Sequence, residues 1–285
     1  MPAISVRHVT TYRYDAPVDT GLQQLRLTPK SRAGQQVRDW HTEIRGGRVE
    51  CAFDDQHANR VQLVSLEPGA TEVEVTAHGT VDVEDRGGVV GVHGGFVPLW
   101  LFLRPTDRTR RGPGTLGLVR DLRGQEDQLA QMHALSAAIR ETVAYATGTT
   151  DVGMTAEDAV EAGTGVCQDH AHVFVACARI LERPARYVSG YLRMDDREQQ
   201  EATHAWAEAH VDGLGWVGFD VSNGISPDAR YIRVATGLDY DDAAPIRGLR
   251  QGAGAETMAV TLRVADGAPQ SQSQSQGGQS QTQQQ

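Results

Sequence analysis

The residues Gly163-Thr-Gly-Val-Cys167-Gln-Asp-His-Ala-His172 open a segment that continues as Val-Phe-Val-Ala-Cys-Ala-Arg-Ile-Leu181 and stops before Pro184. We expect a helix that ends near Leu181, because proline lacks a backbone donor and cannot continue a helix. Apolar residues lie all around this helix, which predicts burial on most sides. Cys167 falls in its first turn, where the positive end of the helix dipole favours a thiolate. The glycines before it leave room for a substrate backbone to approach the sulfur.

Helix and strand patterns flank this segment in a definite order. Apolar residues recur at helical steps over residues 127–145, and a second short helix is expected to start near Thr155. Strands are expected after Pro184, at residues 185–193, 203–212, 215–221, 231–236 and 258–264. Helices followed by an antiparallel sheet predict an α+β domain over residues 125–266.

The first 104 residues have the pattern of short strands. Alternating segments such as Ile4-Ser-Val-Arg7 are separated by turn signals such as Gly46-Gly47. This spacing favours an all-β, sandwich-like domain over residues 1–104. Residues 105–124 are rich in Arg, Gly and Pro, which is typical of an exposed linker. Residues 267–285 are rich in Gln and Ser and are expected to form a disordered tail.

Composition narrows the class of protein. With 39% hydrophobic and 22% charged residues over 285 positions, the chain has the make-up of a globular protein with a substantial core. The formal net charge of −10 and the lack of a basic stripe argue against a nucleic-acid partner. The N-terminus lacks the apolar core of a signal peptide, and the longest apolar run, residues 96–103, is too short to span a bilayer. We therefore expect a cytoplasmic protein that does not bind membranes.

Cys167, His204 and Asp220 supply a thiol, a base that can activate it and an acid that can orient the base. His204 begins the strand His-Ala-Trp-Ala-Glu-Ala-His, and Asp220 ends the next strand. A hairpin between these strands would bring Asp220 back alongside His204, where its carboxylate can accept the second imidazole N–H and hold the tautomer. The three cysteines are an odd number and suggest no disulfide framework. Cys51, in a strand, and Cys177, deep in the helix, are expected to be structural.

In combination these segments resemble the core of bacterial transglutaminase-like proteins, which are often named as cysteine proteases. The resemblance is carried by the segment from Gly163 to His172 and by Pro184-Ala-Arg-Tyr-Val-Ser-Gly-Tyr191, His204-Ala-Trp206 and Gly215-Trp-Val-Gly-Phe-Asp-Val-Ser-Asn-Gly224. Near the N-terminus, His8-Val-Thr-Thr-Tyr-Arg-Tyr14 followed by Pro17-Val18 is similar to the β-rich region found with these cores.

The resemblance implies a papain-like catalytic fold, with helices packed on an antiparallel sheet, and maps the nucleophile, base and orienting acid onto Cys167, His204 and Asp220. Two positions depart from the family pattern. His170 stands where relatives usually carry an aromatic residue, and Asp220-Val-Ser-Asn223 replaces the common Asp-Pro-Thr-Asn. Neither change falls on the three implied catalytic positions, but His170 would alter the pocket.

Three further residues are candidates for the substrate pocket: Asp169, His170 and Trp206. Asp169 equally suits a helix start, where an acidic side chain stabilises the first turn. Trp206 is more typical of packing than of a substrate platform. His170 and His172 point away from each other on a helix, so we expect no metal site, and no other cofactor is implied.

The function expected is cysteine-dependent acyl transfer on peptide or glutamine-type amide bonds through a thioester. Water would resolve the thioester in an amidase or peptidase, and an amine would resolve it in a transglutaminase; residue types do not separate the two. The backbone N–H of Cys167 is one expected oxyanion donor. A non-catalytic peptide-binding module on the same fold is the alternative. A redox role for Cys167 lacks a resolving cysteine within reach. The expected partner is a peptide or protein substrate, and the oligomeric state stays open.

Overall fold

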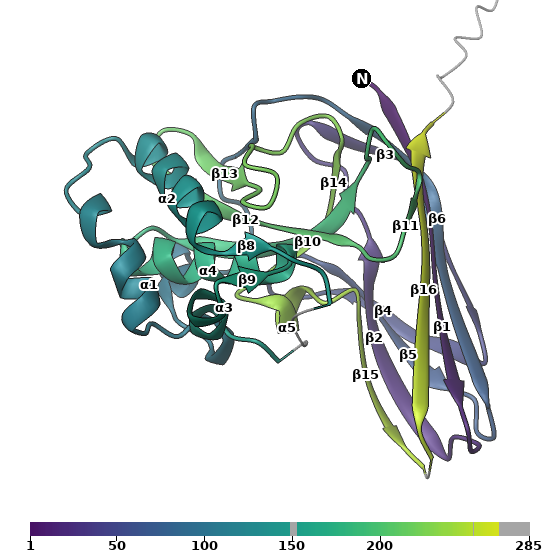
Figure 1. The fold of residues 1–285 in the computed structure, drawn as a ribbon. Coiled ribbons are helices and arrows are strands. Elements are labelled where there is room, and N and C mark those ends of the chain that lie inside the picture. Colours follow the sequence, from purple (N-terminus) through teal and green to yellow (C-terminus); the bar gives the residue numbers. More distant parts are fainter. Residues whose placement is uncertain (149–152, 253, 268–285) are drawn as a thin grey trace, which may run out of the picture.

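The computed structural model describes residues 1–148, 153–252 and 254–267 (Figure 1). Its strands are β1 (Ala3–Tyr14), β2 (Thr20–Thr28), β3 (Gln35–Arg45), β4 (Gly47–Asp54), β5 (Arg60–Leu66), β6 (Glu72–Val83), β7 (Val89–Gly91), β8 (Ala144–Tyr145), β9 (Thr164–Gly165), β10 (Ala185–Leu192), β11 (Gln199–Gln200), β12 (His204–Val211), β13 (Gly215–Phe219), β14 (Tyr231–Gly237), β15 (Ile246–Gln251) and β16 (Glu256–Asp266). Its helices are α1 (Pro113–Leu118), α2 (Gln128–Thr142), α3 (Ala156–Ala162), α4 (Cys167–Ile180) and α5 (Tyr240–Ala243), with short 3₁₀ turns η1 (Leu99–Leu103), η2 (Asp107–Thr109) and η3 (Arg120–Leu122). The expected tail lies outside the described residues, except for Gly267.

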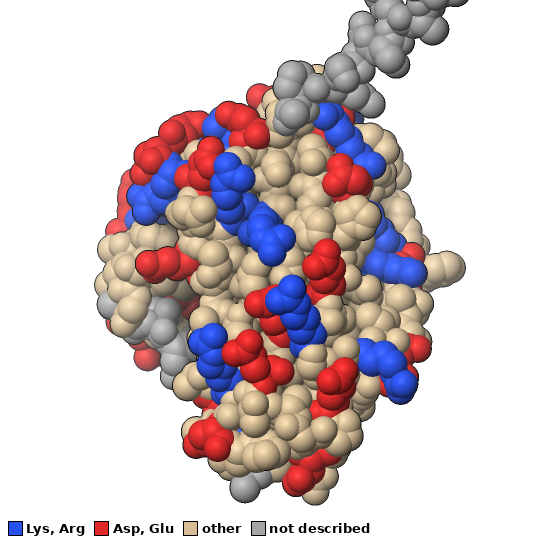
Figure 2. Space-filling view, turned by 90° about the vertical axis from the view of Figure 1, so that its right-hand side faces the viewer, with Lys and Arg blue, Asp and Glu red and all other residues tan. Residues whose placement is uncertain are grey.

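The N-terminal region consists of two antiparallel sheets. One has the strand order β11-β16-β1-β6-β3, and the other has the order β15-β2-β5-β4. They pack on each other through Leu25 and Val64 of one sheet and Val75 and Ala77 of the other. Strand β1 alternates buried and exposed side chains over most of its length, as expected of a strand with one face on a core. Figure 2 shows acidic and basic side chains interspersed over the outside of this region.

The end of the described chain returns to the N-terminal region. Strand β16 pairs with β1 along its whole length, from Ile4 opposite Asp266 to Tyr14 opposite Glu256, and β15 pairs with β2. Figure 1 shows β16 running beside β1, far from the helices. The range 125–266, expected to be one catalytic domain, therefore contains three strands, β11, β15 and β16, that belong to the N-terminal sheets. A division into two folding units stays a prediction.

The segment expected to be an exposed linker, residues 105–124, has many exposed residues but also folds into short helical turns with buried side chains. It forms η2, α1 and η3, and the side chains of Thr109, Thr115 and Val119 are buried. Arg179 of α4 donates from Nη1 to Thr109 Oγ1 at 2.8 Å, and the Glu157 carboxylate accepts from the backbone N–H of Thr115 at 3.0 Å. Tertiary contacts with α3 and α4 thus give this Arg- and Gly-rich backbone specific partners, and its role as a linker between two domains stays a prediction.

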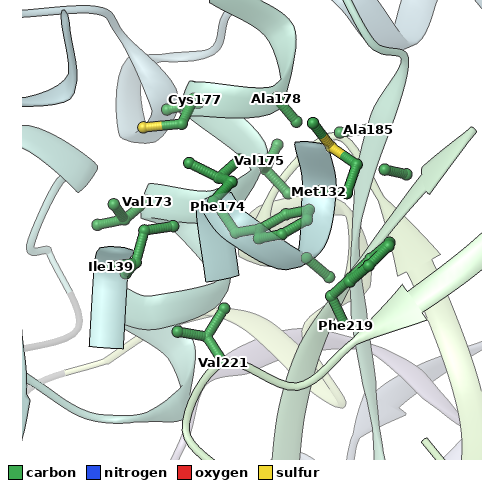
Figure 3. Close-up of a cluster of buried hydrophobic side chains, with 14 of the residues drawn as sticks. Met132, Ile139, Val173, Phe174, Val175, Cys177, Ala178, Ala185, Phe219 and Val221 are labelled. Carbon is green, nitrogen blue, oxygen red and sulfur yellow. The ribbon is translucent and has the colours of Figure 1, made fainter. Parts of the chain in front are cut away.

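Helix α4 lies at the centre of the second region, against a sheet of order β14-β10-β12-β13-β7. Every residue from Asp169 to Arg179 is buried, as the sequence predicts. Figure 3 shows Phe174 of α4 packed near Met132 of α2 and Phe219 of β13; the rings of Phe174 and Phe219 stack with centroids 5.0 Å apart. The α+β class expected for the chain is confirmed. No helix within the described ranges is long and apolar enough to cross a membrane.

The helix expected over residues 127–145 ends earlier than its apolar pattern suggests. Helix α2 stops at Thr142, and Val143 already has an extended backbone. The chain then forms β8, which pairs in parallel with β9, immediately before Cys167. This early end brings Tyr145 beside the start of α4, a placement that the helical pattern conceals.

Candidate active site

Cys167 is the first residue of α4 and is partly exposed. The backbone N–H groups in the first turn of a helix have no acceptor within that helix, so the N–H of Cys167 can donate to a ligand oxygen. Asp169 stabilises this turn: its Oδ2 accepts the backbone N–H of Val166 at 2.8 Å, and its side chain is buried. A Cβ on Gly165 would lie 2.8 Å from the Cβ of Asp169, so only glycine fits there without displacement. These contacts fit the helix-start role considered for Asp169.

A tight hairpin brings His204 and Asp220 together, as the sequence predicts. Strands β12 and β13 pair antiparallel, with Val211 opposite Gly215, and Asp220 directly follows β13. Gly213 in the turn has a φ of 82°, a conformation that glycine adopts without steric cost. His204 Nε2 donates to Asp220 Oδ2 at 2.6 Å.

Asp220 is fully buried and accepts hydrogen bonds from more than the histidine. Its Oδ2 also accepts from the hydroxyl of Tyr231 and from Nδ2 of Asn223, each at 2.7 Å, and Oδ1 accepts the backbone N–H of Asn223 at 3.2 Å. Tyr231, which stands on β14, carries no sequence signal for this role. Asn223 belongs to the segment Asp220-Val-Ser-Asn223 noted in the sequence, and this was the one sequence signal for these two residues. Together these donors fix the carboxylate against rotation.

The electrostatics of the pair favour a charged imidazolium. Burial alone lowers the pKa of His204, but hydrogen bonds to Asp220 and Cys167 and the charges of both outweigh burial and raise it to about 10. Burial raises the pKa of Asp220, yet the bonds from His204, Asn223 and Tyr231 leave that pKa below its ordinary value. Because Nε2 of His204 bonds Asp220, the contact of His204 with Cys167 is made by its other ring nitrogen, Nδ1. His204 therefore lies between the thiol and the carboxylate.

His170 and Trp206, both candidate pocket residues, are buried. His170 Nε2 donates to the carbonyl of Val143 at 2.8 Å, and its Nδ1 accepts from Ser222 Oγ at 2.8 Å. Burial lowers the pKa of His170, so the ring is neutral and these two bonds are consistent with a single tautomer. The ring thus ties α4 to the loop that follows Asp220. Trp206 packs near His204, with ring centroids 6.2 Å apart.

The two histidines considered for a metal have separate partners. His172 Nε2 accepts the backbone N–H of Tyr240 at 3.2 Å, and complete burial lowers the pKa of this histidine to about 3. His170 is bonded to Val143 and Ser222, as described above. Within the described ranges, no group of three His, Cys, Asp or Glu side chains is placed to hold a metal ion.

Tyr145 is a site residue that the sequence analysis missed. It stands on β8 with 55% of its surface exposed. Its pKa is raised by partial burial and by the nearby charges of Cys167 and Asp220, which places the ring within electrostatic reach of both. Its ring centroid lies 6.1 Å from that of His170. An exposed aromatic ring beside the thiol is suited to contact a substrate.

Comparison with known proteins identifies both regions. Residues 117–221 match the transglutaminase-like superfamily, and residues 4–82 match the bacterial transglutaminase-like N-terminal region. An uncharacterized protein of Mycobacterium leprae is 28% identical over 284 residues, covering 91% of this chain and 97% of that protein. An uncharacterized protein of Mycobacterium tuberculosis is 27% identical over 274 residues, covering 86% of each.

Solved structures include one with the same fold over nearly the whole chain. It is named a "putative cysteine protease" from Cytophaga hutchinsonii and superposes with a TM-score of 0.76 at 20% identity, covering 94% of this chain and 92% of that one. At this identity the likeness establishes the fold. The family matches cover the N-terminal strands and the segment from the end of α1 through β13, including Cys167, His204 and Asp220. The chain therefore has a transglutaminase-like core over residues 117–221 and the bacterial transglutaminase-like N-terminal region over residues 4–82.

Proposed function

We propose that the protein is a cysteine-dependent acyl-transfer enzyme that acts on peptide or glutamine-type amide bonds. One observation carries the proposal: the ring of His204 bonds Asp220 on one side and Cys167 on the other, at the start of a buried helix. A thiol becomes a good nucleophile when a protonated imidazole and a helix N-terminus stabilise its thiolate. Cys167, His204 and Asp220 are accordingly proposed as nucleophile, general acid–base and orienting acid.

The proposed reaction begins with the Cys167 thiolate attacking the carbonyl carbon of the amide. The oxyanion that forms is stabilised by the backbone N–H of Cys167. The C–N bond then breaks, and the imidazolium of His204 gives its Nδ1 proton to the departing ammonia or amine. Water or an incoming amine attacks the resulting thioester, returns a proton to His204, and releases the product with the thiolate restored.

Asp220, Tyr231 and Asn223 act through His204 in this scheme. Oδ2 of Asp220 accepts hydrogen bonds from Tyr231, Asn223 and His204. The first two hold the carboxylate in place, so the imidazole of His204 keeps one orientation throughout the cycle. Tyr145, partly exposed beside Cys167, is proposed to contact the acyl donor. A peptide or protein substrate and a cytoplasmic location stay predictions.

The proposal is tested by incubating the protein with a library of glutamine-containing peptides, with and without methylamine, and quenching with acid at short times. We expect mass spectrometry to find an acyl adduct on the tryptic peptide that contains Cys167. Product should appear as the free acid or cleaved peptide in water alone, or as the methylamide when the amine resolves the thioester. If peptides bind, as followed by fluorescence anisotropy, but neither adduct nor product forms, the protein is a binding module.

Cys167 should react with iodoacetamide faster than the other two cysteines and should stay reactive at pH 6. Its sulfur contacts His204, which is protonated at that pH because its pKa is raised to about 10. A simple thiol, with a pKa of about 8.5, would react roughly tenfold more slowly for each pH unit below that value. Cys177 is buried and its pKa is raised by burial, so it should not label in the folded protein.

Brief labelling followed by mass spectrometry of tryptic peptides measures these rates, with exposed Cys51 as the internal reference. Faster labelling of Cys51 than of Cys167 at pH 6 would contradict the proposed nucleophile.

A further inference from the structure

A buried ion cluster lies on the face of the second-region sheet that is turned away from α4. Glu208 of β12 is fully buried and accepts hydrogen bonds from Arg186 Nε at 2.6 Å, from Arg233 Nε at 2.6 Å and from Arg233 Nη2 at 3.0 Å. Arg186 comes from β10, the neighbour of β12, and Arg233 comes from β14, the next strand beyond β10 in the same sheet. One carboxylate thus neutralises only part of the charge of two guanidinium groups.

A third guanidinium, that of Arg32, approaches the cluster from the loop between β2 and β3. Burial lowers its pKa to about 10, with the charge of Glu208 opposing and that of Arg186 reinforcing the effect, so Arg32 lies within electrostatic reach of both. Its Nε is buried and meets no hydrogen-bond acceptor among the residues that the structure describes. Three guanidinium groups therefore lie within electrostatic reach of one buried carboxylate, and the Nε of Arg32 is left unsatisfied, which is costly in a protein interior.

Arg32 lines a pocket of about 70 Å³ between the N-terminal region and the sheet. Arg233, Glu208, Trp206 and Tyr231 also line it. A water molecule needs roughly 10–15 Å³ on this measure, so the pocket has room for roughly five water-sized groups, the number of heavy atoms in phosphate.

Gln35 fixes the wall of this pocket. Its side chain donates to the carbonyl of Arg233 at 2.9 Å and accepts the backbone N–H of Arg233 at 2.8 Å, which holds the loop of Arg32 against β14. The pocket is therefore built from two regions of the chain that are hydrogen-bonded to each other.

The other carboxylates around the pocket do not neutralise Arg32. Asp228 is paired with Arg230, whose Nε and Nη2 donate to it at 2.7–3.0 Å. Glu84 is exposed, on the loop that follows β6. Glu208 is bonded to Arg186 and Arg233, as described above. The interior of the pocket thus keeps an excess of positive charge.

We propose that this pocket is a binding site for a small oxyanion, either inorganic phosphate or a short carboxylate, with the guanidinium of Arg32 as its principal donor. An oxyanion would offset the excess charge of the three arginines, and guanidinium groups bind such anions well. The pocket is separate from Cys167 but adjoins the candidate active site, because Trp206 packs near His204 and Tyr231 bonds Asp220. The inference does not depend on catalysis by Cys167.

The test follows thermal unfolding of the full chain during titration with phosphate and, separately, with acetate, at constant ionic strength set by sodium chloride. Wild type should show a saturable rise in Tm, on the order of 5 °C when the anion exceeds its Kd about 100-fold. Arg32→Leu should bind at least tenfold more weakly, yet unfold without anion at the same or a higher temperature, because it removes an uncompensated charge. Arg7→Gln, an exposed position on β1, removes the same charge and should respond like wild type.

The two titrations distinguish phosphate from a carboxylate as the ligand, and a saturable rise in Tm with either one supports the site. Arg32→Lys keeps the charge but lacks the planar fork of donors, so it should also bind several-fold more weakly and serves if Arg32→Leu does not fold. The proposal would be overturned if the Tm of Arg32→Leu rose with anion as that of wild type does. If Arg32→Leu does not fold, the same response of Arg32→Lys would overturn it. So would a wild-type Tm that shows no saturable response to either anion.

Discussion

Replacing Cys167 with alanine should abolish acyl transfer, with a loss on the order of 10⁶-fold, the scale found when the nucleophile of a serine protease is removed. The acyl group in the proposed reaction is carried by sulfur, and the other two thiols cannot take that place. Cys177 is fully buried and Cys51 stands on exposed β4. The measurement is single-turnover formation of the acyl adduct with a glutamine-containing peptide, followed by mass spectrometry.

Cys51→Ala is the matched control, because it removes a thiol of the same chain at an exposed position and should keep the wild-type rate. Circular dichroism should show that both variants fold, since alanine is a good helix former and Cys167 is partly exposed. Residual turnover in Cys167→Ala well above the uncatalysed rate would place the nucleophile elsewhere. An acyl adduct that forms in wild type and Cys51→Ala, but not in Cys167→Ala, would identify Cys167 as the nucleophile.

The pairing of His204 with Asp220 could be predicted because it is a local event. Two strands with a short turn between them form a hairpin, and alternation then decides which residues meet. The start of α4 at Cys167 was similarly visible from the glycines before it and Pro184 after it. Each of these signals lies within a short stretch of sequence, where local patterns are most informative.

The remaining contacts depend on pairings that a local pattern does not contain. Tyr231 stands on β14, which β10 and β12 separate from β13, and alternation along β14 does not specify that its hydroxyl bonds Asp220. In the same way, the pattern of β16 predicts a strand but not its partner β1, more than 240 residues earlier. The partners of Thr109 and Thr115 are likewise Arg179 and Glu157, which are distant in sequence.

The departure at His170 illustrates the same limit. Its position in the motif suggested an altered substrate pocket, but both ring nitrogens are bonded within the protein, to Val143 and Ser222. A histidine in place of the usual aromatic side chain here adds two hydrogen bonds, one to the carbonyl of Val143 at the end of α2 and one to Ser222 in the loop after Asp220. The sequence showed which residue was unusual, and only the packing showed what it contacts.

Asp220→Asn should slow acylation by up to about 10⁴-fold, the loss known for the equivalent change in a serine enzyme, while the fold is kept. The amide is nearly the same size, but it stabilises an imidazolium poorly and can hold the wrong tautomer. Asp196→Asn, in an exposed pair with Arg197, is the control and should be silent. Tyr231→Phe removes one of the three side-chain donors to Asp220 and should have a smaller effect.

The pH dependence of acylation by Asp220→Asn separates an orienting role of Asp220 from a merely structural one. The raised pKa of His204 means that its ion-pair stabilisation is complete below its unfolded value of about 6.5 and is lost as pH rises through about 10. Wild-type acylation should therefore fall on the alkaline side near pH 10. Asp220→Asn removes the partner that most raises this pKa, so its alkaline limb should move toward neutral pH. A variant that folds, acylates at the wild-type rate and keeps the alkaline limb near pH 10 would show that another group orients His204.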